Sequence, residues 1–282
     1  MSAPSFPLVF TDLDGSLLDH HSYRFDSARP MLARLQANAV PVVIATSKTR
    51  AEILRIREAL SNSHPFIAEN GAAVYIPREY FAAVPPECEE RDGYWVKEFS
   101  PSRQCWLVVL QELEEEFSGE FEYFFRAQEA GIARMTGLAP AEAALANQRE
   151  FSEPVQWLGS DARKLEFLRA LGQRDVHPLQ GGRFLTLAGD CDKGRALCWL
   201  RELYARQNGD VLISDIAIGD SSNDIAMLEV AGTALVVRSP VHAFPRLQRQ
   251  QGVIYSNGFG PEGWAEGVEQ WLQARASNRK QN

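Results

Sequence analysis

The chain has 282 residues, of which 45% are apolar and 23% charged, ordinary values for a globular protein with a packed core. Its formal net charge is −8 at pH 7 and its basic residues are scattered, which argues against nucleic acid as a partner. No stretch reaches the roughly 20 apolar residues of a membrane span, and the N-terminus does not resemble a signal peptide. The four cysteines lack C-x-x-C spacing, so we expect free thiols and a cytoplasmic location.

The first 60 residues twice repeat a strand, a loop and a helix. Continuous apolar runs predict the strands, and apolar residues at helical spacing predict the helices. Thr49 and Glu52 have the spacing of a capping box at the start of the second helix. This repeat is typical of a doubly wound α/β sheet. The predicted strands are 8–11 and 40–45, and the predicted helices are 28–36 and 51–60.

The pattern changes after a predicted β-hairpin at 65–77, in which Asn70 and Gly71 are suited to a tight turn. From about residue 81 the regular alternation is lost, and a Glu-rich helix is expected near 111–117. We interpret 81–188 as an inserted α+β domain.

Regular alternation returns after residue 189. Helices are predicted at 193–207, 222–230 and 261–274, and strands at 215–218, 234–237 and 253–255. The expected fold class is therefore α/β. Residues 1–80 and 189–282 would form a doubly wound, Rossmann-like parallel-sheet core, and 81–188 an inserted cap domain.

Polar motifs follow three of the predicted core strands. Asp12-x-Asp14-Gly15 follows the first, Thr46 follows the second, and Gly219-Asp220-x-x-Asn223-Asp224 follows the strand after the insertion. Lys193 begins the helix before that last strand. Open α/β sheets bind ligands at the carboxyl ends of their strands, so these residues are candidates for one site. The alternative for the first motif is a turn with two solvated aspartates.

These residue types together suit phosphoryl transfer. Asp12 could attack phosphorus as a nucleophile, and Asp14 could protonate the leaving oxygen and then activate water. Lys193 would offset the negative charge, and the Thr46 hydroxyl would hold a phosphate oxygen. With Asp220, the carboxylates form an oxygen site suited to Mg²⁺.

In this order, the motifs resemble those of the haloacid-dehalogenase-like phosphatases, and the position of the insertion resembles class II members with a type-B cap. The resemblance implies an aspartyl-phosphate on Asp12. It implies that Mg²⁺ is bound by the Asp12 side chain, the backbone carbonyl of Asp14 and the Asp220 side chain, with Asp224 completing the predicted metal site. It also implies that the cap selects the substrate.

A closer resemblance is to the mannosyl-3-phosphoglycerate phosphatases. The segments that carry it are 12–19, 45–52, 65–72, 135–138, 149–154 and 181–184. Among them, Thr46-Ser47-Lys48-Thr49 stands where the wider class usually has Thr-Gly-Arg. The implied substrate is mannosyl-3-phosphoglycerate or glucosyl-3-phosphoglycerate, and the product a glycosyl-glycerate compatible solute. The candidate substrate-binding residues are Ser47, Lys48, Glu69, Asn70, Arg183 and Asn223.

Three other functions are compatible with the same residues. A phosphomutase would return the phosphoryl group to a sugar, and a phosphatase of broad specificity would accept many sugar phosphates. A non-catalytic phosphate- or metal-binding module would not need the acid–base group Asp14. The expected partner is a small phosphorylated glycoside, with no membrane and no nucleic acid, and the sequence does not determine the oligomeric state.

Overall fold

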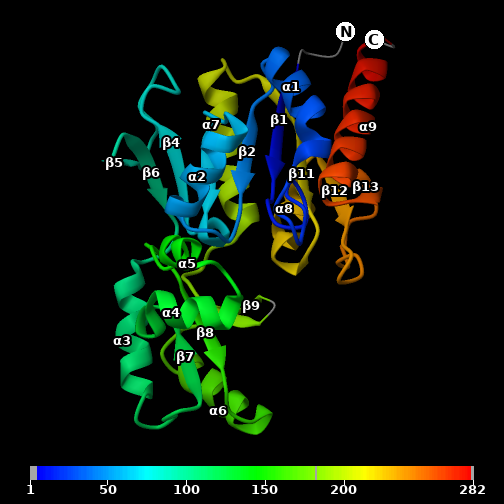
Figure 1. Ribbon diagram of the computed structural model, residues 1–282. Helices are drawn as coiled ribbons and strands as arrows, with labels where there is room; N and C mark the ends of the chain where they lie inside the picture. Colours follow the sequence, from blue (N-terminus) through cyan, green and yellow to red (C-terminus); the bar gives the residue numbers. More distant parts are fainter. Residues whose placement is uncertain (1–4, 182, 281–282) are drawn as a thin grey trace. The chain divides into compact units, whose positions relative to one another are not determined.

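The computed structural model describes residues 5–181 and 183–280 (Figure 1). Gly182, in one of the segments that carry the closer resemblance, lies outside the described residues. The chain divides into two compact units. The first comprises Met1–Thr46, Ser63–Lys97 and Asp192–Asn282, and the second comprises Ser47–Asn62 and Glu98–Cys191.

The first unit is built on a nine-stranded sheet with the order β13-β12-β11-β1-β2-β3-β4-β6-β5. Each neighbouring pair from β13 to β3 is parallel, whereas the β3–β4 and β5–β6 pairs are antiparallel. The strands are β1 (Ser5–Thr11), β2 (Val42–Ala45), β3 (Phe66–Ala68), β4 (Ala73–Pro77), β5 (Glu89–Arg91), β6 (Tyr94–Glu98), β11 (Leu212–Gly219), β12 (Thr233–Arg238) and β13 (Val253–Phe259).

Helices flank this sheet, because the central strands are apolar on both faces. Leu8, Val9 and Phe10 of β1 are consecutive and fully buried, as expected of a strand inside a parallel sheet. The helices of this unit are α1 (Arg29–Ala37), α7 (Lys193–Gln207), α8 (Ile225–Val230) and α9 (Gly260–Lys280), with 3₁₀ turns η1 (Asp26–Ala28), η2 (Glu69–Gly71) and η3 (Ser222–Asp224). The predicted α/β fold class is confirmed.

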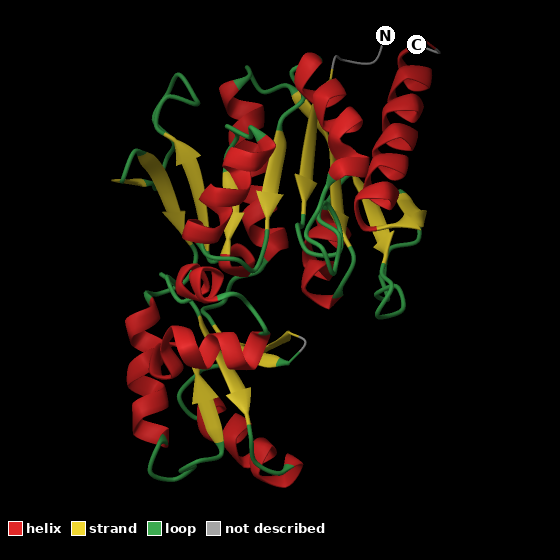
Figure 2. Cartoon of the chain, viewed as in Figure 1, coloured by secondary structure: helices red, strands yellow, loops and turns green. Residues whose placement is uncertain are grey.

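The second unit contains a four-stranded antiparallel sheet with the order β7-β8-β10-β9, whose strands are drawn in yellow beside red helices in Figure 2. Phe121 and Val155 on one face of this sheet form a hydrophobic core with Leu110 and Phe167. The elements of this unit are α2 (Arg50–Leu60), α3 (Arg103–Leu113), β7 (Phe121–Tyr123), α4 (Phe124–Thr136), α5 (Pro140–Ala146), β8 (Glu153–Trp157), α6 (Asp161–Gly172), β9 (Leu179–Gly181) and β10 (Phe184–Leu187).

Three details differ from the sequence-based expectation. The first unit extends to Lys97 rather than ending at residue 80, because β5 and β6 extend its sheet, and the second unit also takes in Ser47–Asn62, which were expected in the core. The helix expected at 111–117 is α3, which begins at Arg103 and ends at Leu113, before Glu114, Glu115 and Glu116. Its buried positions Trp106, Leu110 and Leu113 follow helical spacing, whereas the glutamates were mistaken for its centre.

The third difference is the turn of the predicted hairpin. The strands pair as expected, but η2 connects them through a 3₁₀ turn in place of a two-residue primed turn. Glu69 and Asn70 both have left-handed backbones, with φ of 49° and 60°.

The predicted capping box at the start of α2 is present. The Thr49 hydroxyl accepts from the Glu52 N–H, and the Glu52 carboxylate accepts from the Thr49 N–H.

None of the helices among residues 5–181 and 183–280 is both long enough and apolar enough to cross a membrane.

The end of β1 is tied to α9 by a buried hydrogen bond, in which the Trp264 indole N–H donates to the Thr11 hydroxyl over 2.9 Å. Trp264→Phe should therefore destabilise the protein by about 1–3 kcal/mol, through the lost hydrogen bond and the smaller side chain. Urea unfolding followed by far-UV circular dichroism measures this change. The matched control is Trp271→Phe on the same helix, whose indole N–H makes no hydrogen bond within the described residues. Equal losses in both variants would mean that the hydrogen bond contributes nothing measurable.

Candidate active site

Two catalytic candidates lie side by side at the carboxyl end of the sheet. β1 and β11 are parallel neighbours in which Thr11 pairs with Ile218. Asp12 therefore follows one strand just as Asp220 follows the other, and the Asp12 N–H donates to the Ile218 carbonyl over 2.8 Å. Both aspartates are buried. The expectation that the first and last motifs meet at one sheet edge agrees with this geometry.

Lys193 joins these strands through a fully buried ammonium group. Its Nζ lies 2.8 Å from Asp12 Oδ1 and 2.7 Å from Asp224 Oδ1. Burial acts to lower the pKa of Lys193, but the two carboxylates outweigh burial and hold that pKa above its ordinary value. The lysine is therefore a permanent cation in the site. It stands at the first turn of α7, where the Asp192 side chain caps the helix by accepting from the Arg195 N–H.

The start of α7 can pack closely against η2 because residue 71 is a glycine. A Cβ atom on this residue would lie 2.1 Å from the Asp192 carbonyl oxygen, and Gly71 itself has a φ of +96°. Any other residue type would both strain the backbone and push Asp192 away. In the sequence, Asn70-Gly71 was interpreted as a hairpin turn, and this packing against Asp192 was missed.

Asp224 holds the last motif together. One of its oxygens accepts from Lys193, and the other accepts from the backbone N–H groups of Asp220 and Ser221, both over 3.1 Å. Gly219 lies against this carboxylate, where a Cβ atom would come within 2.4 Å of Asp224. The Gly-Asp-x-x-Asn-Asp spacing thus builds a turn around a buried carboxylate.

Three buried carboxylates form a group that fits a metal ion. One oxygen from each of Asp12, Asp220 and Asp224 lies within 4.8 Å of the others. Asp220 Oδ1 is buried and has no hydrogen-bond partner among the described residues, so an oxygen lone pair is available to a cation. The donor set is entirely carboxylate, which favours a hard divalent cation such as Mg²⁺. The side chain of Asp14 is not part of this group, and its predicted role as a metal ligand was through the backbone carbonyl.

The same group carries excess negative charge. Burial is the largest cause that raises the pKa of Asp12, and it also raises the pKa of Asp220 to about 7, with a further contribution from Asp224. Lys193 opposes both shifts but does not cancel them. The charge of Asp14 also raises the pKa of Asp12 and Asp220, which indicates that Asp14 lies near both.

A histidine that the sequence did not single out contacts this group. His242 follows β12, and its Nε2 lies 3.3 Å from Asp220 Oδ2. The same oxygen lies so close to Gly15 that a Cβ atom there would approach it to 2.4 Å. Asp220 is therefore confined on its Oδ2 side. No spacing in the sequence could have revealed this contact, because His242 comes from a loop 22 residues beyond Asp220.

Four further candidates of the first unit belong to one hydrogen-bonded region. The Thr46 carbonyl accepts from the Asn70 N–H over 2.9 Å. The Asn223 side-chain amide in turn donates to Asn70 Oδ1 over 3.1 Å. Glu69 precedes Asn70 and is almost fully buried. The turn after β3 is thus connected both to the end of β2 and to the last motif.

The remaining candidates, Ser47, Lys48 and Arg183, belong to the second unit. The Ser47 carbonyl accepts from Arg149 over 2.8 Å, and Lys48 is the next residue. Arg183 is exposed, and its guanidinium donates to the Thr136 carbonyl over 3.1 Å. This bond fixes Arg183 beside the end of α4.

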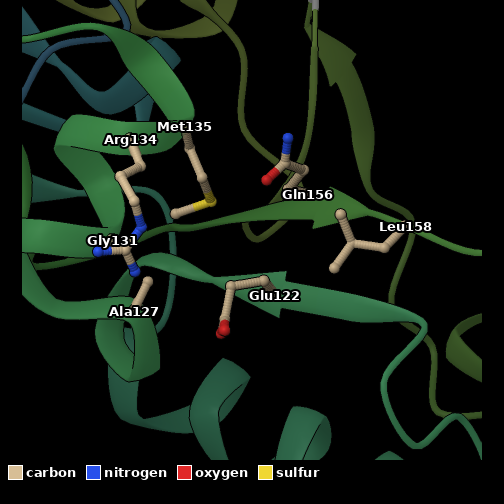
Figure 3. Close-up of a pocket in the computed structure, with 7 residues that line it drawn as sticks. All are labelled: Glu122, Ala127, Gly131, Arg134, Met135, Gln156 and Leu158. Atoms are coloured by element: carbon tan, nitrogen blue, oxygen red, sulfur yellow. The ribbon is translucent and has the colours of Figure 1, made fainter.

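The second unit also contains a cavity of about 350 Å³ between α4 and the strands β7 and β8 (Figure 3). Glu122 and Gln156 are register partners on neighbouring strands, so both project from the face opposite to the hydrophobic core. The lining residues are Glu122, Ala127, Gly131, Arg134, Met135, Gln156 and Leu158. The lining thus combines amide, carboxylate and guanidinium groups with apolar side chains.

The sequence and the fold both match known proteins. The profile of the haloacid dehalogenase-like hydrolases matches residues 9–83. The glucosyl-3-phosphoglycerate/mannosyl-3-phosphoglycerate phosphatase of Methanococcoides burtonii is 34% identical over 264 residues, which are 93% of this chain and 95% of that protein. The chain belongs to the haloacid dehalogenase-like hydrolase family. The predicted resemblance and the predicted enzyme class, a phosphomonoester hydrolase, are confirmed.

Solved structures of other proteins share the fold. A phosphatase of this superfamily from Bacteroides thetaiotaomicron is 18% identical with a TM-score of 0.63, and the match covers 95% of each chain. The sucrose-phosphatase of Synechocystis is 13% identical with a TM-score of 0.61, and the match covers 95% of this chain and 98% of that one.

The excess negative charge leads to a prediction about stability. The folded-state pKa of Asp220, about 7, lies above the ordinary value of 3.8, so the folded state binds the proton more tightly than the unfolded state. Stability from this group is therefore lost as the pH rises from about 4 through 7. In EDTA at pH 8, Asp220→Asn should be more stable than the wild type, by up to about 4 kcal/mol. Thermal unfolding checks this difference.

The comparison has two internal controls. The difference between Asp220→Asn and the wild type should shrink as the pH falls to about 3, where the aspartate is mostly protonated in both states. Saturating Mg²⁺ should raise the melting temperature of the wild type more than that of the variant. A variant that is less stable than the wild type in EDTA at pH 8 would contradict the account of the charge.

Proposed function

We propose that this chain is a Mg²⁺-dependent phosphatase that releases phosphate from mannosyl-3-phosphoglycerate or glucosyl-3-phosphoglycerate through an aspartyl-phosphate on Asp12. The observation that carries the chemistry is the buried Lys193 ammonium between Asp12 and Asp224. The named activity of the 34% identical Methanococcoides relative supports the substrate. The product would be a glycosyl-glycerate, a compatible solute, and the proposed compartment is the cytoplasm.

The first half-reaction uses Asp12 as the nucleophile and Asp14 as the acid. A carboxylate oxygen of Asp12 attacks phosphorus, and the bond from phosphorus to the glycerate oxygen breaks. Asp14 gives its proton to that leaving oxygen, which departs as a hydroxyl group. Lys193 lies 2.8 Å from the attacking carboxylate and offsets the charge that builds up as phosphate approaches it.

The second half-reaction restores the enzyme. Asp14, now ionised, takes a proton from a water molecule, and the oxygen of that water attacks the phosphorus of the aspartyl-phosphate. The bond between phosphorus and the Asp12 oxygen breaks, so that inorganic phosphate leaves and Asp12 is again a carboxylate. The buried position of Thr46 at the end of β2 supports its role as a phosphate ligand.

A divalent cation would be held by Asp12 and Asp220, with the Asp14 backbone carbonyl as the resemblance implies. When bound, it supplies positive charge that offsets the repulsion between phosphate and the carboxylates. Because both oxygens of Asp224 already accept hydrogen bonds, we assign this residue chiefly to holding Lys193. His242 confines the oxygen of Asp220 that faces it, which supports Oδ1 as the donor atom.

The second unit, the proposed cap, would select the substrate. A glycosyl-3-phosphoglycerate carries a carboxylate and several hydroxyl groups besides its phosphate. Lys48 before α2 and the guanidinium of Arg183 offer cations for the anionic groups. Ser47, Glu69, Asn70 and Asn223 are the further proposed contacts.

Removing the carboxylate of Asp12 and removing that of Asp14 should each stop turnover, but for different reasons. Asp12→Asn removes the nucleophile, so phosphate release should fall to background. Asp14→Asn keeps the nucleophile and loses the acid–base group, so turnover should fall by about 10²- to 10⁴-fold. Rapid-quench detection of protein-bound phosphate measures the aspartyl-phosphate directly in both variants. The control is Asp26→Asn, an exposed carboxylate in the same segment that pairs with Arg24 and Arg29. Wild-type rates in either active-site variant would contradict the mechanism.

The substrate is tested by phosphate release from a panel of compounds, each with Mg²⁺ and with EDTA. We expect strong preference for mannosyl- or glucosyl-3-phosphoglycerate over 3-phosphoglycerate and simple sugar phosphates, and no release in EDTA. Similar slow rates on every compound would keep the phosphatase and reject the substrate. Absence of release from all of them would favour the phosphomutase or the binding module.

A further inference from the structure

Two of the segments that carry the closer resemblance are bonded to each other within the second unit. One is 47–50, after β2 in the chain, and the other begins at Arg149. The Arg149 guanidinium donates to the Ser47 carbonyl over 2.8 Å. The Thr49 hydroxyl donates to the Leu145 carbonyl over 2.9 Å. These two bonds fix the backbone on both sides of Lys48.

An ion pair extends the same contact into the first turn of α2. Arg50 Nε lies 2.8 Å from Glu150 Oε1, and about a quarter of each side chain is exposed. Partial burial reduces the screening of such a pair by water. The neighbouring Thr49 is also bound within its own helix by the capping box with Glu52. The loop that carries Lys48 is therefore held by three contacts with residues outside α2 and by the capping box within α2.

The segment that makes these contacts is itself anchored. The Arg103 N–H donates to the Glu150 carbonyl over 2.8 Å, and the Trp106 indole donates to the Phe151 carbonyl over 2.7 Å. Arg149 Nε also donates to the Ser152 hydroxyl over 2.9 Å. Phe151 and Ser152 are buried. Arg149 thus joins the loop to a fixed part of α3 and its surroundings.

We propose that Arg149 and Glu150 are positioning residues that hold Lys48 in the orientation needed to bind an anionic group of the substrate. The inference rests on the proposed function in one respect, the assignment of Lys48 as a substrate-binding residue. A lysine side chain is long and flexible, so its ammonium is placed accurately only where its backbone is fixed. A purely structural clasp would affect stability without acting through Lys48.

A double-mutant cycle separates these two roles. The variants are Lys48→Met, Arg149→Met and the double variant, assayed as full-length protein with Mg²⁺ and glucosyl-3-phosphoglycerate. We expect each single variant to raise KM about tenfold with kcat changed by less than about threefold. The KM of the double variant should be no higher than that of the single variant with the higher KM, because Arg149 acts through Lys48.

Arg149→Lys and Arg169→Met complete the set. Lysine at position 149 can still donate one hydrogen bond to the Ser47 carbonyl, so KM should recover in part, and this variant remains informative if Arg149→Met does not fold. Arg169 is an exposed arginine on α6, and its change to Met should leave KM as in the wild type. The urea midpoint of every variant is measured alongside the kinetics.

The possible failures are distinguishable. A wild-type KM in Lys48→Met would reject Lys48 as a substrate-binding residue, and the inference with it, while leaving the phosphatase intact. A raised KM in Lys48→Met together with an unchanged KM in Arg149→Met would overturn the inference alone. The inference would also be overturned if the two single-variant increases in KM multiply in the double variant. A lower urea midpoint in Arg149→Met without any change in its KM would overturn it as well.

Discussion

The active end of this fold depends on one buried ammonium group. Lys193 lies wholly out of contact with solvent, where an isolated charge would cost several kcal/mol. Its two partners, Asp12 and Asp224, lie far apart in the sequence of the first unit. A carboxylate oxygen of each must come within 3 Å of the same nitrogen. The parallel pairing of β1 with β11, the glycine contact at the start of α7 and the turn around Asp224 all serve this requirement.

The same arrangement concentrates negative charge in the site. Lys193 offsets part of the charge of three carboxylates, and burial raises the pKa of Asp12 and Asp220. In the proposed mechanism, a cation would relieve this repulsion and would at the same time allow a phosphate to approach the Asp12 carboxylate. Under that proposal, stability in the absence of metal and readiness for phosphoryl transfer would conflict, as is common where charges are preorganised for catalysis.

Much of the first unit could be predicted from the sequence, because its strands are unbroken apolar runs and its motifs stand where those runs end. The helix that begins at Lys193 and the capping box at Thr49 were also predictable, since both depend on short-range spacing. The contacts of Gly71 with Asp192 and of His242 with Asp220 were not, because they join residues more than 20 positions apart. α3 was misplaced because its charged end was more conspicuous than its apolar stripe.

Local sequence resemblance need not mark catalytic groups. Arg149 and Glu150 carry part of the closer resemblance, yet their side chains contact Ser47, Ser152 and Arg50 within the second unit. Such a segment is better explained by the loop it supports than by direct chemistry. By this argument, the proposed chemistry lies in the carboxylates and lysine of the first unit. If Lys48 binds the substrate as proposed, selection between substrates would depend on how firmly Lys48 is held, as well as on which side chains are present.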